Sequence, residues 1–490
     1  MILGRRDFLK FGGAALLGSG ALAGAGVSCA HKPAGKADYT LRIGTGLVEL
    51  APDQVVSTTL YNGEFPGPLL RFTEGKSVVV DVYNDTDTPE QLHWHGQTLP
   101  ADVDGAAEEG TPFIPAHGMR RLQFTPGPPG LRFIHTHLVA GADLTMGGYS
   151  GQAAPVYIEP KEHPGAFDQE VFLTLKEFEP FLGPNDDTPT PYLAGAAIPE
   201  LRAKAQAAKA ASMAQHMPPG YDLIYGGFAI NGRALGHGDP IRVKAGQRVL
   251  LHVLNASATE TRSLALPGHT FTVVALDGNP VATQAEVPVL WMGAAERISA
   301  VVTMNNPGVW VLGDLDDHDR PGGMGIVVEY AGRTGPPQWT APPPFTWDYR
   351  LFAAPAGRDS DVPEPDRVID MLFEMQHGAD DGFDVWTING QRFSMQADQP
   401  RFDVEHGKRY RLHMRNATNH NHPMHLHRQP VYITHIAGTP TTGIRKDTVM
   451  LGAYQAMDVD FTASALGLSL FHCHKQSHMD FGFMALFDCR

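Results

Sequence analysis

Cysteine is scarce in this chain of 490 residues, which contains only Cys29, Cys473 and Cys489. Cys29 lies in the amino-terminal segment, and Cys473 stands between histidines, where a metal-bound thiolate is its natural role. Cys489 is then left without a partner for an internal disulfide. A small fold held together by disulfides is therefore excluded.

Positive charge is also in short supply. The chain has 38 Lys and Arg against 53 Asp and Glu, a formal net charge of −15. Without a basic patch to neutralise phosphates, we expect no nucleic-acid partner. The negative charge attracts cations, but by itself it does not select between cationic and neutral small molecules.

Long apolar runs are missing, and the amino terminus has the features of an export signal instead. Gly4-Arg5-Arg6-Asp7-Phe8-Leu9-Lys10 is a twin-arginine pattern, and the apolar run 11–27 is too short and too rich in Gly and Ala for a transmembrane helix. We expect residues 1–30 to be a twin-arginine signal peptide, cleaved near Cys29. The twin-arginine machinery is then a partner, and the mature chain is periplasmic or extracellular. Lipidation of Cys29 is an alternative, although Gly26 stands where a lipobox has Leu, Val or Ile.

Glycine and proline are abundant, at 53 and 39 residues, and favour an all-β fold of short strands joined by turns. One pattern of turn, glycine and alternating strand occurs three times, and it ends in the expected strands 78–84, 249–255 and 410–416. This repeat and the proline-rich stretches between its copies predict domains at 38–160, 166–335 and 366–490.

One alanine-rich segment interrupts the β pattern. Pro199 suits a first helical position, Glu200 and Lys204 form an i,i+4 pair, and Pro218 ends the segment. We expect a helix over 199–217 on the surface of the second domain. It is either a solvated insertion or a lid over the donor site, with Met213, His216 and Met217 as possible soft-metal contacts.

Histidine is concentrated in four short motifs. One cysteine with two histidines is the trigonal set that suits blue copper. Cys473, His478 and His422 can supply this set, whereas the strand neighbours of Cys473 point to the opposite face and would bind other metal. Eight further histidines form four HxH pairs, enough for three more copper ions. The motifs are His93-Trp94-His95, His135-Thr136-His137, His422-Pro423-Met424-His425-Leu426-His427 and His472-Cys473-His474 with His478.

These motifs, in this order, resemble those of three-domain multicopper oxidases of the bacterial laccase type, from about Tyr39 to the carboxyl terminus. The resemblance implies three cupredoxin-like Greek-key β-sandwich or barrel domains, the second without copper, and four copper ions. It implies a type 1 copper at His422, Cys473 and His478 and a type 2 copper at His93 and His425. The type 3 pair would be held by His95, His135, His137, His427, His472 and His474.

The resemblance also implies the reaction. Phenols or aromatic amines would lose one electron at a time near His478 or His422, and dioxygen would be reduced to water with four electrons that pass through Cys473. The alternative is a metallo-oxidase acting on Cu(I) or Fe(II) in metal tolerance. A third hypothesis is a copper-free scaffold that serves for binding, which the intact ligand motifs disfavour.

Three single residues refine this expectation. Asp104 resembles the acid that relatives place beside the oxygen site and would relay protons; otherwise it is a turn residue before Gly105. Many relatives carry a second acid directly after the last histidine, but Met479 stands there, and whether Asp480 replaces that acid is open. Phe483 occupies the axial position, where a phenyl ring cannot coordinate, and this predicts a high reduction potential suited to phenols.

Overall fold

The computed structural model describes residues 35–161, 166–184, 193–355, 362–397 and 400–490. The twin-arginine pattern and Cys29 lie outside the described residues. Residues 37–490 form one compact unit. Within the described part of the chain, none of the helices is both long and apolar enough to cross a membrane.

The first eight strands form two four-stranded sheets, in the orders β2-β1-β4-β6 and β3-β8-β7-β5. Alternation along β4 turns Val78, Val80 and Val82 into the core, where they pack with Leu41 and Trp94. The strands are β1 (Tyr39–Ala51), β2 (Gln54–Tyr61), β3 (Leu70–Thr73), β4 (Val78–Asn84), β5 (His93–His95), β6 (Met119–Phe124), β7 (Gly130–His135) and β8 (Ala153–Glu159).

The next eleven strands build the middle of the chain around a six-stranded sheet, β10-β9-β12-β17-β14-β15, accompanied by the sheets β11-β19-β18 and β13-β16. The strands are β9 (Gln169–Pro184), β10 (Tyr221–Ile230), β11 (Ile241–Val243), β12 (Arg248–Asn255), β13 (Arg262–Leu264), β14 (Phe271–Leu276), β15 (Asn279–Val287), β16 (Leu290–Met292), β17 (Arg297–Thr303), β18 (Val309–Gly313) and β19 (Gly325–Tyr330).

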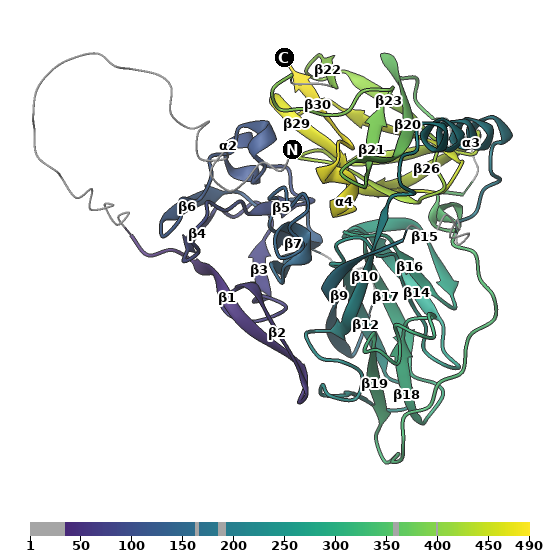
Figure 1. The fold of residues 1–490 in the computed structure, drawn as a ribbon. Coiled ribbons are helices and arrows are strands. Elements are labelled where there is room, and N and C mark those ends of the chain that lie inside the picture. The colour runs from purple at the N-terminus through teal and green to yellow at the C-terminus, as the bar shows by residue number, and fades with distance from the viewer. Residues whose placement is uncertain (1–34, 162–165, 185–192, 356–361, 398–399) are drawn as a thin grey trace, which may run out of the picture. The chain divides into compact units, whose positions relative to one another are not determined.

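The last eleven strands form the six-stranded sheet β21-β20-β23-β28-β25-β26 and the five-stranded sheet β22-β30-β29-β24-β27 (Figure 1). One hydrophobic cluster runs from the middle group of strands into this one. The strands are β20 (Arg367–Asp380), β21 (Phe383–Ile388), β22 (Arg401–Val404), β23 (Arg409–Asn416), β24 (His422–Leu426), β25 (Val431–Ile436), β26 (Thr439–Lys446), β27 (Thr448–Leu451), β28 (Ala456–Thr462), β29 (Gly467–Cys473) and β30 (Met484–Cys489).

The sequence repeat is visible in this topology. The expected strands are β4, β12 and β23, and each pairs in parallel with the strand that opens its group, namely β1, β9 and β20. Each also pairs antiparallel with a later strand on its other side. The all-β class with three cupredoxin-like folds is therefore confirmed.

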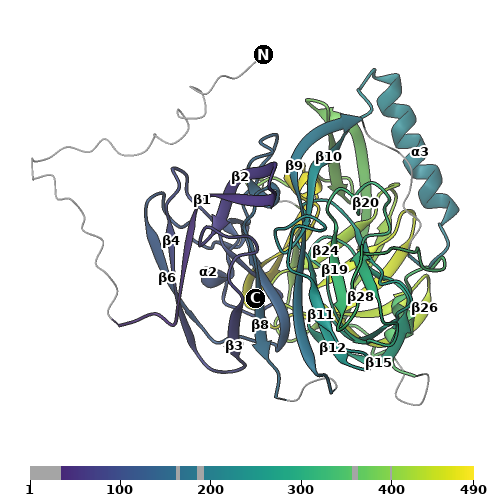
Figure 2. The same cartoon turned by 90° about the horizontal axis from the view of Figure 1, so that it is seen from below.

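The helical insertion is α3 (Pro199–Ala214), with proline in the first turn as expected. It also packs against β20, in the last group of strands (Figures 1 and 2). Lys204 Nζ lies 3.1 Å from Glu374 Oε1, and Leu201 is buried. The expected helix is therefore present, and these side chains join it to a distant segment of the chain.

Candidate metal centre

Two pairs of antiparallel strands position the histidines. β5 pairs with β7, which sets His93 opposite His135. β24 pairs with β29, which sets His425 opposite His472 and Met424 opposite Cys473. Side chains alternate along β29, so Cys473 faces away from its two histidine neighbours, as the sequence predicts.

All eleven candidate ligands come together in buried or half-buried groups. In each group the potential ligand atoms lie within 4.8 Å of one another, and His93, His95 and His427 each belong to two of the groups. The groups are His422, Cys473 and His478; His93, His95 and His425; His95, His135 and His474; His137, His427 and His472; and His93, Asp104 and His427.

Hydrogen bonds to one ring nitrogen leave the other nitrogen free to bind metal. His93 Nδ1 donates to the Asp104 carbonyl at 2.9 Å, and His425 Nδ1 donates to the Asp447 carbonyl at 2.7 Å. Their Nε2 atoms are buried without a hydrogen-bond partner among the described residues. Such bonds fix the tautomer and aim the remaining lone pair, as at protein metal sites.

The His95 ring is reversed relative to those of His93 and His425, because its Nε2 atom makes the hydrogen bonds. Its Nε2 lies 3.1 Å from Asp447 Oδ1 and 3.0 Å from Thr448 Oγ1, and its Nδ1 is the buried nitrogen that finds no partner in the described structure. Arg297 and Arg132 hold the Asp447 carboxylate, at 2.5 and 3.1 Å. The Asp447 group was missed in the sequence because it lies far from every motif and forms part of no pattern.

Burial favours the neutral form of several of these imidazoles. It lowers the pKa of His425 to about 4 and lowers the pKa of His95, His135 and His472 well below the usual value, with the neighbouring imidazoles adding to the effect. A neutral imidazole is the form that ligates a metal. The donor set therefore fits copper, which imidazole and thiolate ligands suit.

Asp104 ends the short helix α2 (Ala101–Asp104) and is fully buried beneath the histidines. Its Oδ2 lies 2.9 Å from His427 Nδ1 and 3.1 Å from His93 Nδ1. A β-carbon on the following Gly105, at φ +107°, would lie 1.9 Å from the Leu92 carbonyl oxygen, so glycine is required for this approach. Asp104 thus holds imidazoles in place, in addition to ending a turn.

The group of His422, Cys473 and His478, called the thiol group from here on, lies on the other side of β29. Cys473 Sγ is 3.4 Å from His478 Nδ1 and 3.7 Å from His422 Nδ1, and these two nitrogens are 3.2 Å apart. Burial raises the pKa of the Cys473 thiol to about 12. The ring of Phe483 lies 4.9 Å from the His422 ring, whereas Met484 packs in a separate cluster with Met479.

Three family models described as multicopper oxidase match residues 45–163, 200–320 and 365–490. Multicopper oxidase MmcO of Mycobacterium tuberculosis is 30% identical over 439 residues, which cover 89% of this chain and 83% of that protein. The chain belongs to the multicopper oxidase family. It is thus a copper-dependent oxidoreductase. Copper resistance protein A of Escherichia coli is 23% identical over 580 residues, with 91% of each chain covered.

Solved structures share the fold of this multicopper oxidase. A multi-copper oxidase from Pseudomonas thermotolerans superposes with a TM-score of 0.67 at 22% identity and covers 93% of this chain and 100% of its own. The laccase from Botrytis aclada superposes with a TM-score of 0.70 at 17% identity and covers 92% and 87%. At these identities the likeness extends to the fold alone.

Met479 stands directly after the last histidine in this oxidase, and the carboxylate of the next residue, Asp480, is bonded to neighbouring amides. Met479 is buried against apolar side chains. The Asp480 carboxylate turns aside to accept hydrogen bonds from the backbone of Ala140 and Gly141 and from Gln476. Burial raises the pKa of Asp480 to about 7.

Two acids near the histidines were missed in the sequence. Glu108 Oε2 lies 3.7 Å from His137 Nδ1, and Glu109 Oε1 lies 3.4 Å from His427 Nδ1. Burial raises the pKa of both carboxyls, and the charge of Asp104 raises that of Glu109 further. Their position directly after the Asp104 turn was the only signal in the sequence.

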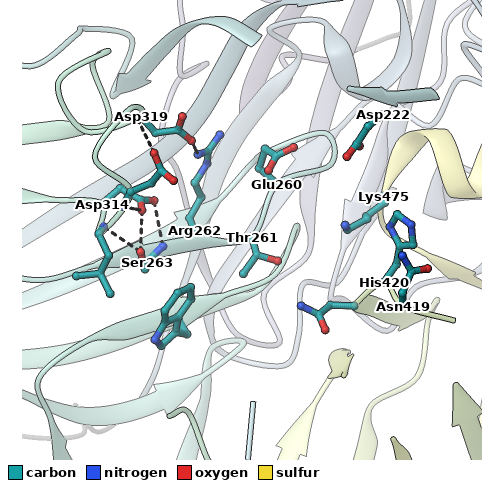
Figure 3. Close-up of a pocket in the computed structure, with 14 residues that line it drawn as sticks. Asp222, Glu260, Thr261, Arg262, Ser263, Asp314, Asp319, Asn419, His420 and Lys475 are labelled. Carbon is teal, nitrogen blue, oxygen red and sulfur yellow. Dashed lines mark hydrogen bonds and ion pairs between the residues drawn. The ribbon is translucent and has the colours of Figure 1, made fainter. Parts of the chain in front are cut away.

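Two hollows lie beside the thiol group. The first, the acidic pocket, measures about 450 Å³, and Figure 3 shows His420, Lys475 and Asp222 on one side of it and Asp314 and Asp319 on the other. The second, the α3 cavity, measures about 260 Å³ and is lined by α3 residues together with Met375, His377 and Thr418. The acidic residues of the first pocket are Asp222, Glu260, Asp314, Asp316 and Asp319.

His420, a further buried histidine, and the three candidates of the helical segment lie outside the groups of the four motifs. His420 stacks edge-on against Trp386, 5.2 Å away, and its Nε2 is buried without a hydrogen-bond partner in the described residues. Met213 is 65% exposed, and neither it nor His216 nor Met217 lines the α3 cavity.

Proposed function

We propose that this multicopper oxidase couples the one-electron oxidation of phenols or aromatic amines to the four-electron reduction of dioxygen to water. His422, Cys473 and His478 would hold a type 1 copper, and His93 and His425 a type 2 copper. His95, His135 and His474 would hold one type 3 copper, and His137, His427 and His472 the other. When bound, these four copper ions supply the one-electron redox chemistry and the oxygen-binding positions.

The observation that carries this proposal is the pairing of the thiol group with the histidine groups across one strand. Cys473 is joined by backbone directly to His472 and His474, so a covalent route connects the donor side with the oxygen side. Phe483 excludes water and offers no ligand atom beside His422, which favours a high potential. Such a potential suits phenols, which give up electrons reluctantly.

The donor is best accommodated in the α3 cavity. Thr418 Oγ1 lies 2.8 Å from His422 Nε2, so the cavity wall touches the edge of a type 1 ligand. No carboxylate is found among the described residues that line this cavity. The lining therefore favours a neutral ring over a metal ion, and α3 serves as the roof.

The acidic pocket supports a second candidate, the oxidation of Cu(I) or Fe(II). Its carboxylates are oxygen ligands, and His420, on its wall, lies 5.5 Å from the His478 ring. Arg262 pairs with Asp319 and reduces the negative charge available to a cation. We therefore rank this function second.

A side-by-side rate measurement separates the two donors. Wild-type protein, Ala205→Trp and Asp222→Asn are compared with a phenol, Cu(I) and Fe(II). Filling the α3 cavity with Ala205→Trp should lower the rate with the phenol, and Asp222→Asn should lower only the rates with metal ions. Cys473→Ser is the control: it should lose the blue absorption and oxidise no donor. A blue Cys473→Ser protein would refute the copper assignment.

We also propose that the mature protein works in the periplasm or outside the cell. The support is the Arg5-Arg6 pattern of the amino-terminal segment, with cleavage near Cys29 or lipidation of that cysteine. Replacing Arg5 and Arg6 with lysine should leave the precursor inside the cell. For the mature chain we propose the domain boundaries 38–160, 166–335 and 366–490.

A further inference from the structure

Glu90 is a buried acid that the ligand motifs do not account for. Glu90 is 4% exposed and lies three positions before His93 in the sequence. The backbone fixes it in place, because Glu90 N donates to the Ile114 carbonyl at 2.9 Å and Ile114 N donates back at 2.8 Å. Burying a carboxyl away from water costs free energy, so its position calls for a functional explanation.

The carboxyl is connected to the histidines by two polar side chains. Glu90 Oε2 accepts hydrogen bonds from Gln152 Nε2 at 3.2 Å and from Thr136 Oγ1 at 3.4 Å. Gln152 and Thr136 both line a cavity of about 30 Å³, and His135, His137, His472 and His474 line it too. A polar cavity of this size holds about one water molecule.

The surroundings of Glu90 favour its protonated form. Burial raises the pKa of Glu90 to about 7, and the hydrogen bonds from Gln152, the Gln91 backbone and Thr136 offset only part of this rise. The Glu90 charge in turn reaches Tyr61, whose pKa rises through burial and through the charge of Glu90. Glu90 therefore exchanges its proton near neutral pH.

We propose that Glu90 supplies protons for dioxygen reduction, through the Thr136 hydroxyl and water in the small cavity. The inference rests on the proposed function. Each dioxygen takes four electrons from four donor oxidations and four protons, and two waters leave. Glu90 releases a proton towards the cavity and is reprotonated from solvent before the next transfer.

Thr136 is what distinguishes Glu90 from Asp480. A hydroxyl both accepts and donates a proton, so it can pass one on. The partners of Asp480 are two backbone N–H groups and the amide of Gln476, which only donate to the carboxylate. Among the described residues, no hydroxyl is found that joins Asp480 to this cavity, although its pKa is also raised.

Glu90→Gln is the central test, because it keeps the acceptor for Thr136 and removes the ionisable proton. The copper-free protein is examined first by infrared difference spectroscopy between pH 6 and pH 8. The wild type should lose the carbonyl bands of protonated carboxyls as pH rises, with Asp480 contributing besides Glu90, and the Glu90 band should be missing from Glu90→Gln while the Asp480 band remains. An identical difference spectrum in the variant would overturn the inference.

The copper-loaded protein is then reduced without oxygen and mixed with dioxygen. Reduction of the blue site by the donor should be unchanged, while reoxidation at pH 7 should slow at least about tenfold in Glu90→Gln. The wild-type reoxidation rate should also fall as pH rises through about 7, and the variant should lose this dependence. Glu64→Gln, an exposed acid, should behave as wild type.

Thr136→Val is an independent test of the route, and it remains available if Glu90→Gln does not fold. It keeps Glu90 and its infrared band but removes the hydroxyl, so reoxidation should slow as in Glu90→Gln. Fast reoxidation in Thr136→Val overturns the route. A wild-type protein that binds no copper or is not reoxidised by dioxygen would instead overturn the proposed function.

Discussion

The Asp447 carboxylate is buried between Arg297, Arg132 and His95, and its neutralisation is a sharp test of how charge holds the oxygen site together. Arg297 donates to it twice, at 2.7 and 2.5 Å, and is itself 0% exposed. Asp447→Asn leaves two buried guanidinium groups without their shared anion. Removing one partner of a buried pair costs about 3–5 kcal/mol of unfolding free energy.

The exposed pair of Arg42 and Asp85 is a matched control. Its geometry is also bidentate, at 2.9 and 2.7 Å, but the two side chains are 54% and 46% exposed. Solvent screens such a pair, so Asp85→Asn should cost at most about 1 kcal/mol. Urea unfolding of the copper-free proteins at pH 7, followed by tryptophan fluorescence, measures both losses.

The direction of the Asp447 pKa shift decides how the stabilisation by this carboxylate depends on pH. Burial raises the pKa of Asp447, but the charges of Arg297 and Arg132 outweigh it and hold that pKa below its usual range. The stabilisation is therefore complete above the unfolded-state pKa of about 3.9 and is lost only as pH falls through the folded-state value. Equal losses in Asp447→Asn and Asp85→Asn, or a wild-type advantage that disappears already at pH 6, would refute this reasoning.

Three further variants probe the copper assignments. His137→Ala should remain blue and accept one electron from the donor but fail to turn over dioxygen; a folded, colourless protein would show that the histidine pairs are misassigned. Asp104→Asn should slow reoxidation by dioxygen in stopped-flow measurements while type 1 reduction is unchanged, and unaltered turnover at every pH would leave Asp104 a positioning residue only. Phe483→Met should introduce a weak thioether ligand and lower the reduction potential in a redox titration; an unchanged or higher potential would mean that another group is the axial neighbour.

The sequence was sufficient for features whose chemistry is contained in one short segment. The HxH pairs, the spacing from Cys473 to His478 and the repeated strand pattern each carry their meaning locally, because side chains alternate along a strand. The family, the all-β class and the helix from Pro199 followed from such segments.

Features that depend on tertiary contacts could not be read in advance. Which three histidines form a group depends on the pairing of β5 with β7 and of β24 with β29. The reversed ring of His95 depends on Asp447, which is 352 residues away. The contact of α3 with β20 could not be predicted for the same reason, since helix propensity says nothing about which strand Leu201 and Lys204 will contact.

The protonated state of Cys473 affects how the blue site is assembled. Because the nucleophile in thiol oxidation is the thiolate, a buried thiol with a pKa of about 12 resists peroxide and disulfide exchange while the protein waits for metal. Copper capture then has to expel the thiol proton, so maturation of the blue site should release acid and accelerate as the medium becomes more alkaline. The fold thereby protects the Cys473 sulfur from oxidation until copper binds.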